Sequence, residues 1–188
     1  MPTSAHDLFS RSFDELNEGD SFTTRGRTVT EADVVSFSAL TGDWHPQHAD
    51  AEWAASSQFG ERVAHGMLVL SYAVGLVAFD PDRVVALRKI EDAVFKRPTR
   101  FGDTIHVEGK IEGLKPLDDE IGLATTIWKI VNQDDQVVAR LRIQALWRAD
   151  GQGEESDQNE ESGEEASEDG EDGSSDNESS RDSEGVAS

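Results

Sequence analysis

The chain has 188 residues and a formal net charge of −22, with 39 acidic and 17 basic side chains and no cysteine. Without cysteine, disulfides, thiolate catalysis and cysteine-based metal sites are excluded. A chain this acidic repels phosphates, so we expect no nucleic acid and no membrane as partner. Residues 1–20 lack an apolar signal-peptide core, and the nearly apolar run 67–79 is too short to span a bilayer. We therefore expect a cytoplasmic protein.

The acidic residues are concentrated at the C-terminus. Residues 150–188 contain 16 acidic residues, one arginine and no aromatic residue, which leaves 23 acidic and 16 basic side chains in residues 1–149. Such a segment cannot bury enough apolar surface to offset its chain entropy. The sequence thus predicts one domain, 1–149, and a disordered acidic tail, 150–188. The acidity favours adaptation to high salt, and a local interaction tail is the alternative.

The first predicted elements follow a polar N-terminal lead. Residues 21–29 alternate weakly and fit an edge strand. Thr30 and Asp33 form the T-x-x-D pattern of a helix cap, which predicts a short amphipathic helix that ends at Gly42. Asp50 is placed to cap a second short helix, residues 51–58.

The next element is apolar on every side. Residues 66–79, GMLVLSYAVGLVAF, predict a helix buried at the centre of the fold. Apolar and polar residues then alternate in segments 105–111, 121–127 and 137–147, which predicts three strands joined by hairpin turns. Successive strands favour an antiparallel sheet, and one buried helix against one curved sheet is an α+β fold.

The segment between the first two helices carries an acid and an imidazole. Asp43 and His48 flank Pro46, which fixes its own backbone and keeps His45 out of the helical region. We therefore expect a shaped turn on which Asp43 and His48 converge on one small molecule.

The start of the apolar helix supplies a second half of this site. The N–H groups at a helix start are unpaired, and Gly66 there permits close approach of a ligand to the backbone. A thioester oxygen against the Gly66 N–H would be polarised. His65, just before it, is a candidate hydrogen-bonding group at the helix start.

These segments together resemble one known family. The sequence GDWHPQHAD at 42–50, followed by AHGML at 64–68, is similar to the G-D-x-N-P-x-H-x-D and A-H-G-M-L pattern of the MaoC-like, or R-specific, enoyl-CoA hydratases of the hot dog fold. The stretch FKRPTRFGDTIHV, residues 95–107, also resembles a strand pair of that family. The resemblance covers nearly all of the predicted domain.

The resemblance implies a long helix wrapped by an antiparallel sheet, in a homodimer whose sheets join edge to edge. It implies an enzyme acting on an acyl-CoA thioester, with no cofactor beyond the coenzyme A of the substrate. Asp43 and His48 would hold and deprotonate the water that adds to a trans-2-enoyl thioester, and Gly66 would contact the thioester oxygen. The product would be an (R)-3-hydroxyacyl-CoA, and the reverse reaction a dehydration.

The chain departs from the family pattern at two places. His45 replaces the usual asparagine, from which we expect altered polarity in the substrate pocket. Some members carry a serine where this chain has Val74, and Ser71, one turn nearer, is a candidate substitute for binding substrate.

A run of basic residues suggests a place for the phosphates of coenzyme A. Residues 83–100 contain six of the sixteen basic residues of the predicted domain, among them Lys96, Arg97 and Arg100. These three would bind the phosphates, and the alternative is a solvated strand face.

Three further alternatives remain open. His45, His48 and Asp43 form a permissible metal-ligand cluster, but they lack an evident fourth ligand, and we expect no metal. A hot dog thioesterase would place an acid on or beside the central helix, where residues 67–79 have none. A non-catalytic acyl-CoA-binding protein would not require an acid and a base at this spacing.

Overall fold

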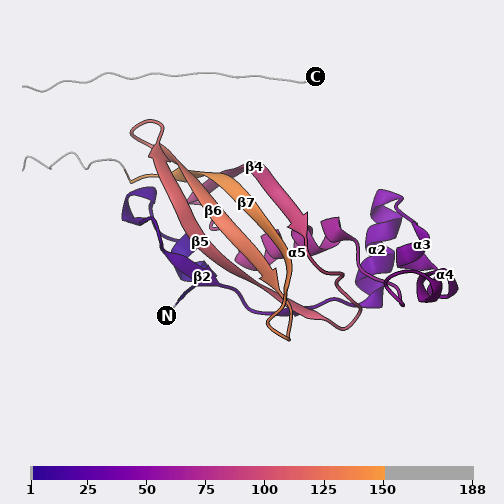
Figure 1. The fold of residues 1–188 in the computed structure, drawn as a ribbon. Coiled ribbons are helices and arrows are strands. Elements are labelled where there is room, and N and C mark those ends of the chain that lie inside the picture. The colour runs from indigo at the N-terminus through magenta and orange to yellow at the C-terminus, as the bar shows by residue number, and fades with distance from the viewer. Residues whose placement is uncertain (1, 151–188) are drawn as a thin grey trace, which may run out of the picture. The chain divides into compact units, whose positions relative to one another are not determined.

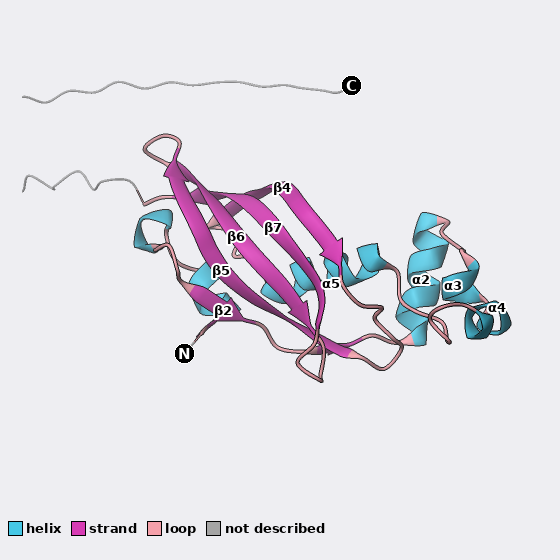
Figure 2. Ribbon diagram, in the orientation of Figure 1, coloured by secondary structure: helices cyan, strands magenta, loops and turns pink. Residues whose placement is uncertain are grey.

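A curved sheet packs against one helix in the computed structural model, which describes residues 2–150 (Figures 1 and 2). The sheet has the order β1-β2-β5-β6-β7-β4, its long strands are antiparallel, and β3 pairs with β5. The strands are β1 (Thr3–Ser4), β2 (Ser21–Thr23), β3 (Arg27–Thr28), β4 (Val84–Phe95), β5 (Thr104–Pro116), β6 (Ile121–Val131) and β7 (Val137–Arg148). Helix α5 (Gly66–Val77) lies behind the sheet in Figure 1. The α+β hot dog prediction is confirmed.

The three alternating segments form the centre of the sheet, as predicted. Burial alternates along β5 and along most of β7, so one face of each strand enters the core. Trp128 on β6 and Trp147 on β7 have no exposed surface. The predicted strand 21–29 is instead two short pieces, β2 and β3, both paired with β5.

The N-terminal segment belongs to the core, so its prediction as a polar lead is wrong. It contains α1 (Ala5–Phe9) and the 3₁₀ turn η1 (Phe13–Glu15). Phe9 is 1% exposed, and its ring lies 5.0 Å from Phe22 and 4.9 Å from Trp147. The apolar residues of α1 fall on one face, but the helix is too short to give a periodic pattern in the sequence.

Strand β4 was not among the three strands predicted from alternation, and it forms one edge of the sheet. It pairs with β7 alone, and register shifts interrupt its ladder at three places. These irregularities disturb the two-residue alternation by which the other strands were predicted. Val84 is buried, but several other large apolar side chains of β4 are exposed, with Val85 at 45%, Leu87 and Ile90 at 41% and Phe95 at 50%.

The helices begin near their predicted caps. Helix α2 (Glu31–Thr41) has a capping box of Thr30 and Asp33, and Gly42 ends it with a φ of 78°. Asp50 caps α4 (Ala51–Ser56) through the backbone N–H of Trp53. A further helical turn, α3 (Pro46–Ala49), was not predicted.

Helix α5 is not buried all round, which corrects its prediction. Leu68, Val69 and Ala73 are buried, but Met67 is 59% exposed and Ser71 also reaches solvent. Among residues 2–150, no element covers the exposed face of α5.

A polar cluster ties α2 to α5. Arg27 lies 3.2 Å from the Asp33 carboxylate and stacks 3.7 Å above the centre of the Tyr72 ring. Burial opposes the charge of Asp33, but hydrogen bonds from Tyr72 and Thr30 outweigh it and lower the pKa of Asp33 to about 2. Burial and the Asp33 hydrogen bond raise the pKa of Tyr72 to about 12. The first turn of α2 is therefore anchored to the central helix.

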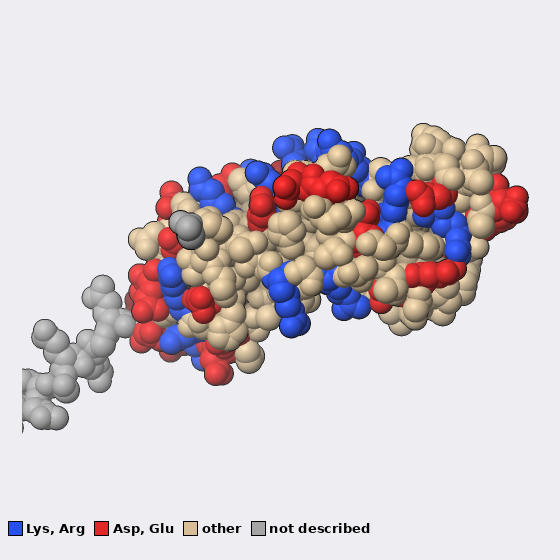
Figure 3. All heavy atoms as spheres, turned by 90° about the horizontal axis from the view of Figure 1, so that it is seen from below, with Lys and Arg blue, Asp and Glu red and all other residues tan. Residues whose placement is uncertain are grey.

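Charges of both signs are mixed on the surface of residues 2–150. On the face drawn in Figure 3, Lys and Arg atoms lie among Asp and Glu atoms.

Asp150, predicted as the first tail residue, pairs with Arg83, and its N–H donates to Asp14. The remaining predicted tail lies outside the described residues. Among residues 2–150, no helix combines the length and apolarity needed to cross a membrane.

Candidate active site

The segment from Gly42 to α3 is shaped by its caps. The left-handed Gly42 ends α2, and Pro46 occupies the first position of α3, where its missing N–H costs nothing. His45 is the N-cap of α3, and its Nδ1 accepts a hydrogen bond from the backbone N–H of Gln47 at 3.2 Å. An asparagine oxygen makes the same kind of cap, so His45 preserves the role that an asparagine would fill.

His48 is held in α3 with one ring nitrogen directed to the backbone. It is 5% exposed, and its Nδ1 lies 2.7 Å from the Val63 carbonyl oxygen. Because a carbonyl only accepts, Nδ1 carries the proton and Nε2 keeps its lone pair, 3.0 Å from the Gln47 amide. Burial lowers the pKa of His48, and the imidazoles of His65 and His45 act in the same direction. His48 is thus arranged as a neutral base.

Asp43 and His65 complete the polar group. The His65 ring stacks on that of His48 with centroids 3.7 Å apart, and its Nε2 lies 3.0 Å from the Asp43 backbone oxygen. The Asp43 carboxylate is 3.9 Å from the same nitrogen. Ligand atoms of Asp43, His48 and His65 lie within 4.8 Å of one another, so this trio, rather than one with His45, has metal-ligand spacing.

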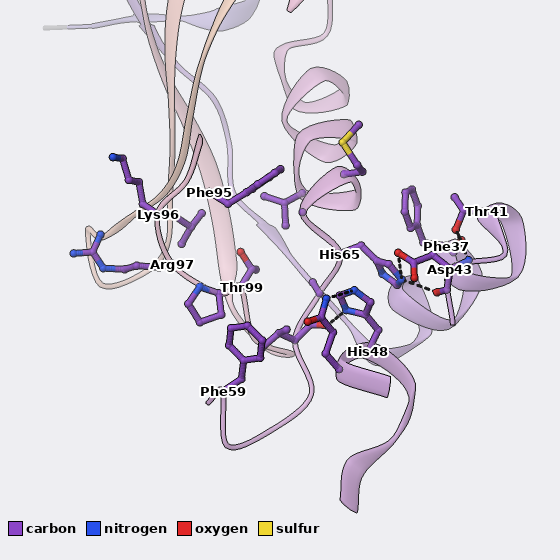
Figure 4. Close-up of a pocket in the computed structure, with 18 residues that line it drawn as sticks. Phe37, Thr41, Asp43, His48, Phe59, His65, Phe95, Lys96, Arg97 and Thr99 are labelled. Carbon is purple, nitrogen blue, oxygen red and sulfur yellow. Dashed lines mark hydrogen bonds and ion pairs between the residues drawn. The ribbon is translucent and has the colours of Figure 1, made fainter. Parts of the chain in front are cut away.

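These groups open into a cavity of about 620 Å³ beside the start of α5. Half of the 18 residues that line it are apolar, among them Phe37, Phe59, Met67, Val69, Phe95 and Val138. Figure 4 shows Asp43, His48 and His65 on one side, and Phe95, Lys96 and Arg97 on the other. Gly66 also lines the cavity, and a β-carbon there would stand 2.7 Å from the Phe95 ring. The absence of a side chain at Gly66 therefore lets the Phe95 ring pack closely against the helix start.

Three of the residues predicted for the site lie elsewhere. The His45 ring packs edge-on against Trp53 at 5.5 Å and does not line the cavity. The Ser71 hydroxyl donates to the Met67 carbonyl at 2.8 Å, on the exposed face of α5. Arg100 also lies outside the lining, and its Nε is 2.5 Å from Glu61.

Two neighbours of the site were missed by the sequence analysis. Ser38 on α2 is 1% exposed, and its hydroxyl lies 3.3 Å from His65 Nε2. The sequence could have revealed Ser38 by its position: it lies four residues after the buried Val34, on the same face of α2, where a hydroxyl interrupts an apolar stripe. Phe95 was missed as a cavity wall because β4 gives no clear alternation.

An acid, an imidazole and the glycine that starts the central helix thus line one cavity, on the fold that the MaoC-like resemblance implied. The model of the MaoC like domain family matches residues 15–141. The chain therefore belongs to this family.

Two relatives are similar in sequence, and one of them is named as a hydratase. Protein MaoC of Klebsiella aerogenes is 45% identical over 100 residues, which are 53% of this chain and 30% of that protein. The (R)-specific enoyl-CoA hydratase of Rhodospirillum rubrum is 30% identical over 123 residues, or 65% of this chain and 85% of the hydratase. The chain thus spans under a third of the Klebsiella protein and most of the Rhodospirillum one.

Solved structures agree with the fold. The monoamine oxidase regulatory protein of Archaeoglobus fulgidus has a TM-score of 0.70 and 34% identity, over 74% of this chain and 95% of that one. An R-hydratase of Pseudomonas aeruginosa has a TM-score of 0.61 and 28% identity, over 73% and 86% of the two chains.

Proposed function

We propose that this protein is an (R)-specific hydratase that interconverts trans-2-enoyl-CoA and (R)-3-hydroxyacyl-CoA. The observation that carries the proposal is the convergence of Asp43 and the Nε2 of a neutral His48 on the cavity that also exposes Gly66. The names of the Rhodospirillum and Pseudomonas relatives support the same reaction. The apolar walls suit an acyl chain.

The chemistry follows from these positions. His48 Nε2 and the Asp43 carboxylate hold a water and accept its proton as the oxygen bonds to C3 of the enoyl group. The Gly66 N–H at the start of α5 stabilises the negative charge that develops on the thioester oxygen. A proton then returns to C2, so that one water is added across the double bond.

One assay separates this proposal from the two alternatives. With crotonyl-CoA, a hydratase removes the ultraviolet absorbance of the conjugated enoyl group without releasing thiol. A thioesterase releases free thiol, detected by a thiol reagent, and a non-catalytic binder gives neither signal but binds in calorimetry. Thiol release without hydration, or binding alone, would overturn the proposal.

Repeating the assay at low and high salt tests whether the acidity is an adaptation to salt.

The activity should persist into mildly acidic solution. His48 acts as a base only when neutral, and burial lowers its pKa, so protonation should set in below the ordinary histidine value of about 6.5. We expect kcat/KM for crotonyl-CoA to fall at low pH with a midpoint below 6.5. A pH profile with its acid midpoint above 6.5 would be inconsistent with a neutral, buried His48 as the base.

Lys96 and Arg97 are proposed to bind the phosphates of coenzyme A. Both line the cavity opposite Asp43, and the Arg97 guanidinium is fixed by the Val137 carbonyl at 2.8 Å. Lys96→Ala should raise KM for crotonyl-CoA by roughly 10-fold, the scale of one charge-assisted contact. It should not change KM for crotonyl-N-acetylcysteamine, which has no phosphates.

Lys115→Ala is the matched control for Lys96→Ala, because Lys115 is an exposed cation of β5 outside the cavity. Equal effects of Lys96→Ala on the KM of the two thioesters, or an effect of Lys115→Ala as large, would exclude Lys96 from phosphate binding.

We also propose that a second copy of the chain pairs along β4. This edge strand has 12 residues and exposes Leu87 and Ile90, a combination that an isolated soluble domain normally avoids. Ile90→Lys should shift the protein from dimer to monomer in sedimentation velocity. Leu40→Lys, at an 82% exposed position of α2, should not. A monomeric wild type would contradict the pairing.

A further inference from the structure

His65 is buried where three helices meet at the site. It is 2% exposed and precedes α5, its ring packs 5.0 Å from Phe37 of α2, and it stacks on His48 of α3. The sequence predicted a hydrogen-bonding role for His65 at the start of the central helix. Its hydrogen bonds run to the protein, to Ser38 and to the Asp43 backbone.

The tautomer of His65 follows from these contacts. The Asp43 backbone oxygen can only accept, so the His65 Nε2, 3.0 Å away, carries the proton. The Ser38 hydroxyl, 3.3 Å from the same nitrogen and 1% exposed, flanks it from α2. The ring therefore links the last turns of α2 with the backbone of the segment that carries Asp43.

That segment has few other restraints. The Asp43 side chain is 52% exposed and the Trp44 side chain reaches solvent equally. Asp43 stands directly after Gly42, the most permissive residue for backbone rotation. Without the bond to His65, nothing buried would hold the Asp43 backbone at its distance from His48.

We propose that His65 and Ser38 are positioning residues that hold Asp43 and His48 in register for the addition of water. This inference rests on the proposed hydratase function. His65 holds the Asp43 backbone through Nε2 and holds the His48 ring by stacking, and Ser38 fixes the direction of the His65 ring. His65 itself neither exchanges a proton with the substrate nor contacts the thioester.

The other nitrogen of His65 supports a functional role for the ring. Among the buried side-chain nitrogen and oxygen atoms of residues 2–150, only His65 Nδ1 lacks a hydrogen-bond partner. An unpaired buried polar atom costs stability, so a residue selected for packing alone would be apolar. The imidazole of His65 is therefore present although it lowers the stability of the fold. This is expected of a side chain that positions catalytic groups.

Three variants separate positioning from packing. His65→Phe keeps a ring against His48 but removes the donor to Asp43. His65→Gln keeps an amide donor near the place of Nε2 but loses the stack. Ser38→Ala removes one of the two partners of Nε2 and leaves the ring in place. His106→Gln is the control, because His106 lies on β5 outside the cavity.

We expect His65→Phe to lower kcat for crotonyl-CoA by roughly 10–100-fold, because small displacements of reacting groups have effects of this size. KM should change by less than about 3-fold, and the Tm should be equal or higher because the unpaired Nδ1 is gone. His65→Gln should have a higher kcat than His65→Phe. The kcat of Ser38→Ala should be about 3–10-fold below that of the wild type, and the kcat of His106→Gln should equal it.

The outcomes are distinguishable. Wild-type kcat in His65→Phe, or a loss that appears only as a raised KM, would overturn the positioning role and leave the hydratase proposal intact. If the wild type itself hydrates no enoyl thioester, the proposed function fails. Long-range ¹H–¹⁵N NMR of the histidine rings then still decides the geometry: His65 should show the Nε2–H tautomer, and the His48 signals should move in Ser38→Ala. A Nδ1–H tautomer would contradict the inference.

Discussion

Asp43→Asn is expected to lower kcat for crotonyl-CoA hydration by roughly 10²–10⁴-fold, the usual contribution of a general base. The change should leave the fold intact. The Asp43 Oδ1 accepts a hydrogen bond from the His45 backbone N–H at 3.2 Å, and an asparagine oxygen can accept it equally. Only the charge and the basicity are lost. The measurement is the initial rate of disappearance of the enoyl absorbance, with the Tm recorded for each variant.

Asp50→Asn is the matched control, seven residues further along the same segment. Asp50 caps α4 through the Trp53 N–H at 3.0 Å, and asparagine is as good a cap as aspartate. We expect its activity to equal that of the wild type. The kcat of His48→Ala should fall, like that of Asp43→Asn. An active Asp43→Asn, His48→Ala double variant would show that other residues carry out the reaction.

Phe9→Ala should destabilise the protein by about 3–5 kcal/mol, the cost of truncating a fully buried aromatic side chain. The Phe9 ring is 1% exposed and lies 4.9–5.1 Å from the rings of Phe22, Phe79 and Trp147. Its loss would leave a cavity between α1 and the sheet that these large rings cannot close. The free energy of unfolding is measured by urea titration of the purified protein.

Leu40→Ala is the control for Phe9→Ala, since Leu40 is a helical apolar residue that is 82% exposed. It should change the free energy of unfolding by less than about 0.5 kcal/mol. Equal stability of Phe9→Ala and the wild type would mean that the N-terminal segment does not belong to the core.

The sequence predicted those parts of the fold whose side chains repeat along an element. Strands β5, β6 and β7 alternate over many residues, and α2 and α4 have polar caps whose chemistry is local. Helix α1 and strand β4 lack such signals: one is a single short turn, and the other has a ladder interrupted by register shifts. Their places depend on contacts with distant residues, as between Phe9 and Trp147.

The candidate site was predicted where the chemistry lies in one short segment. Asp43, His48 and Gly66 were identified from their spacing, and the structure brings them to one cavity. The roles of His45 and His65 depend on ring orientation, which spacing does not contain. His45 turns back to cap α3, and His65 turns to the Asp43 backbone.

Other site residues come from distant parts of the chain. Ser38 reaches His65 across 27 residues of sequence, and Phe95 reaches Gly66 from the edge of the sheet. Ser71 was predicted as a substrate-binding residue one helical turn before Val74, but it projects from the exposed face of α5. Only the packing of α2 and β4 around α5 determines which of these side chains meet the cavity.

The most direct measurement of the central claim is the fate of the oxygen in crotonyl-CoA turnover in ¹⁸O-labelled water. If Asp43 and His48 direct water to C3, the product is (R)-3-hydroxybutyryl-CoA with a single ¹⁸O in its hydroxyl group, and Asp43→Asn forms almost none. Label found in a free carboxylate, an S-configured product, or equal labelling by Asp43→Asn would contradict the account.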